Sequence, residues 1–428
     1  MLKKSLQQIL FEGKFQISLA RFKKQSNSID LSPQANSLML NPSGLRPPLS
    51  SRLTRIWRGI TRRLQFVRAL IGLPGRLASW LVSRRIQRSK INQFRYGTRK
   101  KLVIFLIPGI QRVVGGMLQI FSLHRLSREF FKDTEVDSLI CWLPGEGWAD
   151  HRYDGFNNDV TVFPLRMVLK SCAPNCELMI HLPEFAAERF CNSFGWDRLT
   201  SLRESNSLRI NILQQNSDTM PSPSFIKQLL AIFSDLSSTV CNSAWVTVGE
   251  RRRLGIPLHF LPTWYYPDDA PWQPYESKEN LLIVSPDPNP NRDLIIGAIR
   301  NALPSLRIQV IWGLKYEQYL ELERAAKWSI TFGEGLDGYF YGPMLRGGVA
   351  FAVRNATFDL PGLEEKTTIY PSYEVMANRI VEDIKALDSK VVYEAYNKSV
   401  RGPLKNEFGR DRTTQALAAF YRGEWTLP

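Results

Sequence analysis

The sequence predicts an α/β protein with two Rossmann-like domains that face a cleft, preceded by a basic amphipathic helical arm. Strand-like apolar runs alternate with helical stretches, stop at a proline-rich segment and then begin again, which is typical of two doubly wound domains. About 325 residues follow the arm, enough for two domains of ordinary size. The third observation is that the positive charge gathers in the arm.

Residues 1–101 hold 22 of the 56 Lys and Arg residues and two of the 40 acidic residues. Their net charge is +20, whereas the remaining chain carries −4. The protein is therefore a near-neutral body behind a cationic arm, and the arm limits the partners to be considered.

The arm has the pattern of a helix that lies on a membrane surface. Residues 52–71 place apolar side chains at three-and-four spacing with arginines on the other side, and a second such stretch with Trp80 runs to Lys90. Pro74 and Gly75 separate the two stretches. Each cation near an anionic leaflet contributes about 1 kcal/mol. No apolar run reaches the roughly 18 residues needed to span a bilayer.

The partner predicted for residues 52–90 is therefore an anionic membrane surface, and the predicted location is cytoplasmic, peripheral on the inner face of the membrane. Residues 1–51 are expected to be a flexible basic segment. Three alternatives remain open for the arm: nucleic-acid binding, a transit peptide, and a helix packed on its own body. We expect no nucleic acid, because zinc-ligand spacing and RNA-binding aromatic motifs are missing and the body is slightly acidic.

The five cysteines are odd in number and follow no signal peptide, which favours reduced thiols in a cytosol. Cys172, Cys176, His181 and Cys191 lie close together in sequence. Their spacing matches no familiar zinc module, so a structural zinc site remains only an alternative.

Six strand-like runs predict the first parallel sheet, in a domain spanning 102–261. They cover residues 102–107, 138–143, 160–163, 178–180, 208–212 and 239–241. A linker is expected at 262–280, where four prolines occur, and a second domain at 281–412. Its predicted strands are 281–284, 308–311, 329–332 and 349–353, with helices at 293–302 and 316–326.

Ligands of such sheets bind at the carboxyl ends of the strands, which directs attention to the residues that follow them. Gly115 and Gly116 fall between the first strand and the first helix, where backbone amides can approach an anion. They form neither a dinucleotide fingerprint nor a P-loop, which disfavours NAD and ATP. An ordinary turn explains the pair equally well.

A glycine-rich segment at 331–348 carries the most specific signal in the chain. Glu334 stands between Gly333 and Gly335, a placement that core packing does not explain. Here the chain resembles retaining nucleotide-sugar glycosyltransferases of the GT-B fold (glycosyltransferase family 4-like). Glu334 and Gly335 match the first part of their signature without a gap, and Met344 and Gly347 match the last part.

The resemblance implies that Glu334 contacts the donor sugar and that Gly333, Gly335, Leu336 and Asp337 belong to the donor site with Gly115 and Gly116. The structural alternative for Glu334 is a loop carboxylate that caps a helix. Gly342 stands where the family has a second Glu that holds the ribose, so the chain departs from the family there.

The resemblance also implies two cations that grip the donor diphosphate. Arg292 lies near one of these positions, Pro286 occupies the other, and Lys315 is a possible replacement. In the first domain, His181 is a candidate catalytic residue and Glu184 and Asn216 are candidate acceptor-binding residues, because each is expected at a strand end. A structural histidine and an ordinary polar turn are the alternatives.

The segment 254–262 resembles the family's last strand before the linker, and 413–428 resembles the helix that crosses back to the first domain. The predicted function is transfer of a hexose, with retention, from a nucleotide-diphosphate donor to a glycan or lipid-linked acceptor in surface polysaccharide synthesis. We expect no metal and no cofactor besides the nucleotide sugar, which is a co-substrate. The alternative is a non-catalytic sugar- or nucleotide-binding protein of the same fold.

Overall fold

The structure is a computed structural model that describes residues 76–92, 101–109, 115–144, 150–172, 175–205, 207–264, 271–355, 360, 362–363 and 366–428. All of them belong to one compact unit, Gly72–Pro428. The predictions for residues 1–51 and 52–71 lie outside the described residues.

The first domain is built on a seven-stranded parallel sheet with the order β3-β2-β1-β4-β5-β6-β7. The strands are β1 (Lys101–Ile107), β2 (Val136–Trp142), β3 (Val162–Pro164), β4 (Glu177–Pro183), β5 (Ser207–Gln214), β6 (Leu236–Val240) and β7 (Leu258–Phe260). β2 and β3 are added on one side of β1 and β4 to β7 on the other, so the topological switch of this doubly wound sheet lies at β1.

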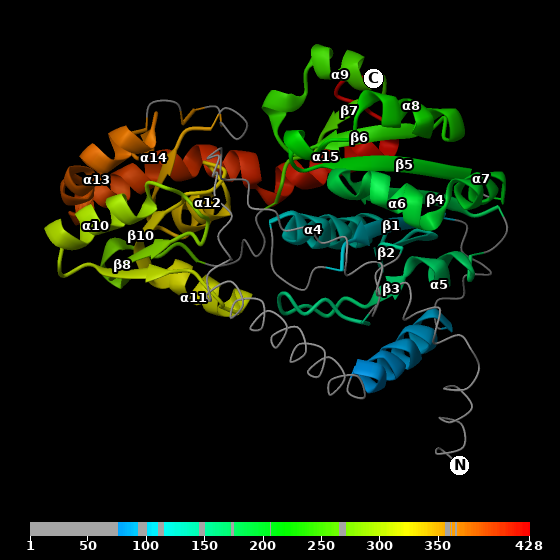
Figure 1. The fold of residues 1–428 in the computed structure, drawn as a ribbon, viewed down its shortest axis with the longest axis horizontal. Helices are drawn as coiled ribbons and strands as arrows, with labels where there is room; N and C mark the ends of the chain where they lie inside the picture. Colours follow the sequence, from blue (N-terminus) through cyan, green and yellow to red (C-terminus); the bar gives the residue numbers. More distant parts are fainter. Residues whose placement is uncertain are drawn as a thin grey trace, which may run out of the picture. The chain divides into compact units, whose positions relative to one another are not determined.

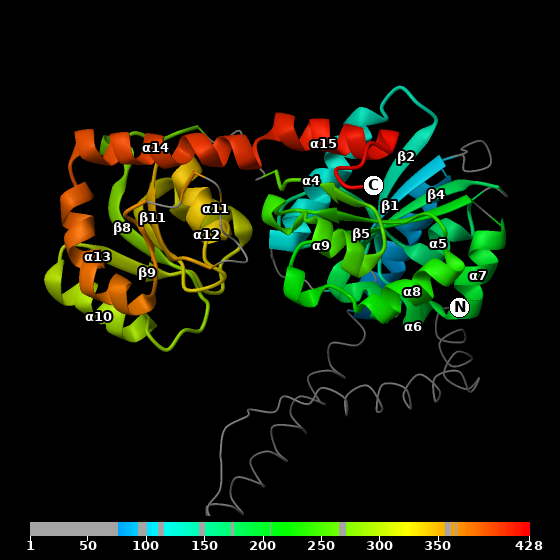
Figure 2. The same ribbon diagram turned by 90° about the horizontal axis from the view of Figure 1, so that it is seen from above.

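Helices connect these strands and cover the sheet (Figures 1 and 2). They are α4 (Gly115–Phe130), α5 (Leu165–Leu169), α6 (Ala187–Phe194), α7 (Trp196–Ser205), α8 (Pro223–Ile232) and α9 (Val248–Leu254), with short 3₁₀ turns η1 (Glu184–Ala186), η2 (Ser217–Thr219) and η3 (Ser243–Trp245).

The uninterrupted apolar run of β1 is explained by burial on both faces of the sheet. Leu102, Ile104 and Leu106 belong to one hydrophobic core, whereas Val103 and Phe105 belong to another. Successive side chains of a strand point to opposite faces, so a central parallel strand needs apolar residues at every position.

The second domain has a five-stranded parallel sheet with the order β12-β11-β10-β8-β9. The strands are β8 (Glu279–Val284), β9 (Arg307–Val310), β10 (Ala326–Ile330), β11 (Val349–Val353) and β12 (Ile369–Tyr370). The helices are α10 (Arg292–Ala302), α11 (Tyr316–Ala325), α12 (Gly338–Leu345), α13 (Tyr373–Leu387) and α14 (Lys390–Phe408), and η4 (Tyr275–Ser277) precedes the sheet.

The last helix, α15 (Arg410–Arg422), packs on the first domain although it follows α14 of the second. The Tyr421 hydroxyl lies 2.6 Å from the Ser127 hydroxyl of α4, and His259 of β7 hydrogen bonds with the carbonyl of Ala416. Figure 2 shows α14 and α15 following each other in red. The chain thus returns to the first domain near residue 428.

The predicted fold class, α/β with two Rossmann-like domains, is confirmed by these two parallel sheets. The strands differ from the predicted runs in the positions of some of their ends, and one strand was not predicted. β4 continues to Pro183, β10 ends at Ile330, and β12 is a two-residue strand that hydrophobic runs do not predict.

From the predicted arm, residues 76–92 are described and form one helix. Among the described residues, no helix is both long enough and apolar enough to cross a membrane.

Candidate functional site

The candidate site lies where the strands of both sheets end. Glu184 follows β4, Asn216 follows β5, and the loop 331–337 follows β10. The carboxyl ends of parallel strands share one edge of a sheet, and helix N-termini and turns there expose backbone amides.

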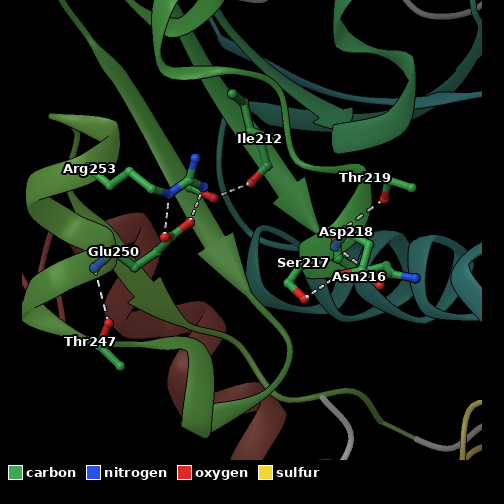
Figure 3. Close-up of polar contacts among 9 residues, drawn as sticks. Ile212, Asn216, Ser217, Asp218, Thr219, Thr247, Glu250 and Arg253 are labelled. Carbon is green, nitrogen blue, oxygen red and sulfur yellow. Dashed lines mark hydrogen bonds and ion pairs between the residues drawn. The ribbon is translucent and has the colours of Figure 1, made fainter. Parts of the chain in front are cut away.

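Asn216 begins a tight turn at the end of β5. Its side-chain oxygen accepts a hydrogen bond from the amide of Asp218 (2.9 Å), which caps η2, and Figure 3 shows the turn from Asn216 to Thr219. Asparagine is favoured at such positions because its short amide can replace a backbone acceptor.

Glu184 holds this turn from the neighbouring strand end. Its Oε1 accepts hydrogen bonds from the Asn216 amide (3.1 Å) and the Thr219 hydroxyl (2.9 Å). The side chain is 3% exposed, and burial raises the pKa of its carboxyl although these hydrogen bonds act in the opposite direction. Within the described part of the chain, Oε2 has no hydrogen-bond partner.

Gly116 allows α4 to approach the end of β5. The Gln215 amide donates hydrogen bonds to the Gly116 carbonyl (2.9 Å) and to Gln119 Oε1 (2.8 Å). A side chain at Gly116 would collide with Gln215 Oε1, whereas one at Gly115 would meet open space. A larger residue at position 116 would therefore have to displace the Gln215 side chain from these hydrogen bonds.

The loop after β10 is shaped by two glycines and by hydrogen bonds within the loop. The Thr331 hydroxyl donates to Asp337 Oδ2 (2.9 Å), and Asp337 Oδ1 accepts from the Tyr339 amide (2.9 Å), which caps α12. Gly335 has φ +91°, and a Cβ there would lie 3.1 Å from the carbonyl oxygen of Val353. The backbone conformation and this contact both exclude other residues.

Glu334 projects from this loop and is exposed. Its Oε1 lies 3.4 Å from the side-chain amide of Asn216, which donates to it. Partial desolvation of its carboxyl, followed by the charges of Asp287 and Asp218, raises the pKa of Glu334. The structure thus brings together three residues predicted from the sequence: Glu184, Asn216 and Glu334.

A second carboxyl group in the loop is more strongly perturbed. Burial, with a further contribution from the charge of Asp287, raises the pKa of Asp337 to about 7. A Cβ built on Gly333 would lie 2.8 Å from Asp287 Oδ2 and 2.9 Å from Asp337 Oδ2, so both side chains approach this glycine closely. Asp337 can therefore hold a proton near neutral pH, and both side chains can accept hydrogen bonds from hydroxyl groups of a ligand.

The two cations predicted to bind a donor diphosphate lie at the N-terminal ends of α10 and α11. Arg292 is the first residue of α10, and its guanidinium donates to the carbonyls of Pro286 (3.4 Å) and Asp287 (3.3 Å). Lys315 is exposed at the start of α11. Arg292 thus stabilises the loop after β8 in the structure as described.

The structure places two of the predicted site residues in the hydrophobic interior. His181 does not lie at a strand end, because β4 continues past it and pairs it with Asn211 of β5. Its buried ring stacks on Phe105 (centroid distance 4.4 Å), and burial lowers its pKa to about 3. The Leu336 side chain packs in the second domain's core.

Sequence reasoning missed Asp287 and Asp218 as charged neighbours of Glu334. Asp287 follows β8, a strand end, so its position was a usable signal. Asp218 follows Asn216 in an ordinary-looking turn and gave none.

The alternative of a zinc site at the cysteines finds no support in the described residues, where no group of three or more His, Cys, Asp or Glu side chains is placed to hold a metal ion. All five cysteines are free thiols.

Comparisons with solved structures give likenesses at low sequence identity. The sucrose-phosphate synthase from Thermosynechococcus elongatus is 12% identical with a TM-score of 0.43, covering 76% of this chain and 99% of that chain. The UDP-forming α,α-trehalose-phosphate synthase from Burkholderia vietnamiensis is 11% identical with a TM-score of 0.45, covering 77% and 97%. HepE from Anabaena, in complex with UDP, is 10% identical with a TM-score of 0.45, covering 75% and 99%. No protein-family model and no curated protein sequence matches the chain.

Proposed function

We propose that this protein is a GT-B-type glycosyltransferase that moves a sugar from a nucleotide-diphosphate donor to a glycan or lipid-linked acceptor. The observation that supports this most is the position of Glu334. It lies in a glycine-flanked loop at the carboxyl edge of the second sheet, within hydrogen-bond distance of Asn216 at the carboxyl edge of the first. A carboxylate there can contact donor and acceptor hydroxyl groups at once.

The finer parts of the proposal rest on the sequence motif around Glu334. We infer a hexose as the transferred sugar, retention at the anomeric carbon, and no requirement for a metal ion. Glu334 would stabilise positive charge on the sugar as the bond to the diphosphate breaks. Glu184 would keep the Asn216 turn in place beside it.

The location of the acceptor is inferred from the arm. We propose that residues 52–90 hold the protein on the inner face of an anionic membrane, where it takes part in surface polysaccharide synthesis. The charge of the first 101 residues supports this, since it is separate from the near-neutral body.

The test is Glu334→Gln, which keeps the size of the side chain and the bond to Asn216 but removes the charge. We expect transfer, measured over a panel of nucleotide sugars, to fall at least on the order of 100-fold while the thermal midpoint stays close to that of the wild type. Glu382→Gln on the exposed surface of α13 is the matched control and should be fully active. Full activity of Glu334→Gln would remove this residue from the mechanism.

One observation favours the alternative of a non-catalytic binding protein. Asp287, Glu334 and Asp337 gather where a diphosphate would need cations, and Arg292 bonds to backbone carbonyls. A nucleotide sugar that raises the thermal midpoint but is neither transferred nor hydrolysed, with or without a divalent metal ion, would identify the binding protein.

A further inference from the structure

The helix over residues 76–92 packs on the first domain through one narrow face. Ser83, Gln87 and Ile91, spaced four residues apart, are its buried side chains. Two of these three are polar, so the helix does not use its most apolar face for packing.

Hydrogen bonds fix this face to the edge of the first sheet. The Gln87 amide donates to the carbonyl of Val162 in β3 (2.8 Å), and the Lys90 ammonium donates to the Thr161 hydroxyl (2.6 Å). Since β3 is the edge strand of the sheet, the helix is a fixed extension of the first domain.

The larger apolar side chains of the helix are exposed instead. Leu81 and Val82 are each 55% exposed, and Leu77 is exposed as well. The Arg84 guanidinium lies 5.4 Å from the centre of the Trp80 ring. Exposed apolar side chains grouped on one short helix indicate a surface that another phase or molecule covers.

The charge of the helix indicates what kind of partner would cover this surface. Residues 76–92 contain Arg76, Arg84, Arg85, Arg88 and Lys90 and no acidic residue. An amphipathic helix with leucine, valine and tryptophan beside arginines suits the boundary of an anionic bilayer, where apolar groups enter the acyl region and cations meet phosphate.

A second basic helix of this protein, α9, differs because two of its arginines have hydrogen-bond or ion-pair partners. In α9, Arg253 forms a two-pronged ion pair with Glu250, and the Arg251 guanidinium donates to the carbonyl of Pro428. Figure 3 shows the Glu250–Arg253 pair. This helix carries three arginines and one glutamate, and Val248 is its one large apolar side chain that is exposed, which makes it the control.

We propose that the outward face of helix 76–92, formed by Leu77, Leu81, Val82, Arg85 and Arg88, docks on an anionic bilayer and holds the first domain at the membrane surface. This rests on the proposed function and deepens it, because it assigns membrane contact to particular residues of the first domain, which also holds the candidate acceptor-binding residues Glu184 and Asn216. The hydrogen bond from Gln87 on the opposite face of the helix to Val162 holds the helix on the sheet.

The test is sedimentation of the full chain with phosphatidylcholine vesicles that do or do not contain phosphatidylglycerol. The double variant Leu81→Asp/Val82→Asp should weaken binding to the anionic vesicles at least about 10-fold. Its matched control is Val391→Asp/Val392→Asp, at valines that are 80% and 45% exposed on α14, and this control should bind like the wild type.

A second pair of variants tests the charge. Arg85→Gln/Arg88→Gln should weaken binding to anionic vesicles on the order of 10-fold, whereas Arg251→Gln/Arg252→Gln on α9 should not. Wild-type binding to pure phosphatidylcholine should be weak.

Equal binding of the Leu81→Asp/Val82→Asp variant and the wild type would overturn the assignment of this face. A second outcome would also overturn it: the protein binds duplex DNA, Arg85→Gln/Arg88→Gln abolishes that binding, and Leu81→Asp/Val82→Asp leaves vesicle binding unchanged. The face would then recognise a polyanion and not a bilayer. If the wild type does not sediment with anionic vesicles, the proposed membrane contact is overturned altogether. Sugar transfer to a soluble acceptor is measured separately, so failure of the catalytic proposal is distinguished from all three results.

Discussion

The carboxyl edges of the two sheets differ in the charges that surround their acidic side chains. At the first edge, Glu184 accepts hydrogen bonds from Asn216 and Thr219 and thereby fixes a turn, and burial raises its pKa. At the second edge, burial and then the charge of Asp287 raise the pKa values of both Glu334 and Asp337. Carboxyl groups that lie beside other acidic side chains remain able to respond to a proton or a ligand.

Asp337→Asn tests the crowded edge through stability. The raised pKa of Asp337 means that the folded protein keeps this proton up to about pH 7, while the unfolded chain loses it near pH 4. The contribution of Asp337 to stability is therefore complete below pH 4 and is lost as the pH rises toward 7. Asparagine caps a helix as well as aspartate and does not titrate.

We expect the free energy of unfolding of Asp337→Asn, relative to the wild type, to rise by about 1–3 kcal/mol between pH 5 and pH 8. Urea unfolding at the two pH values measures this difference. A pH-independent difference would mean that Asp337 has an ordinary pKa and that the second edge is less crowded than the structure indicates.

His181→Gln tests the core beneath the first edge. The imidazole stacks on Phe105 and accepts a hydrogen bond from the Asn211 amide (3.1 Å), so its loss should cost about 1–2 kcal/mol at pH 8. Sugar transfer by the folded variant should stay within a few-fold of the wild type, the reverse of the result expected for Glu334→Gln.

The pH dependence of this cost has the opposite sign to that of Asp337. Burial lowers the pKa of His181 to about 3, so its stabilising contribution is complete above about pH 6.5 and is lost as the pH falls. The stability difference between wild type and His181→Gln should narrow from pH 7 to pH 5 in urea titrations. A kcat that falls as far as in Glu334→Gln would return His181 to the catalytic residues.

Much of the fold was predictable because parallel strands that are buried on both faces consist of continuous apolar runs in the sequence. The run 102–107 corresponds to β1, and 349–353 corresponds to β11 without any shift. The position of His181 was not predictable from apolarity, since β4 is extended by its pairing with β5 and not by its own composition.

The candidate site divides in the same way. Glu334 could be found because glycines on both sides are a local signal. The closeness of Asp287 depends on β8 lying beside β10, a neighbour relation between strands that are not consecutive in sequence. The contact between Asn216 and Glu334 joins residues 118 positions apart, for which a single sequence has no signal.

The smallest expected effect concerns Gly116, where the first edge depends on a hydrogen bond that can be displaced. In Gly116→Ala the new methyl group collides with the end of the Gln215 side chain, which is flexible and can move away. That movement breaks the hydrogen bonds of Gln215 to the Gly116 carbonyl and to Gln119, at a cost of about 1 kcal/mol. Alanine stabilises the first turn of α4 by about 0.5–1 kcal/mol relative to glycine.

Gly115→Ala is the matched control, because it has the same helical gain without the collision. It should be more stable than Gly116→Ala by about 1 kcal/mol in thermal or urea unfolding. Equal stability of the two variants would show that the Gln215 contact does not hold α4 against β5, and that the first edge is less firmly organised than the comparison with the second implies.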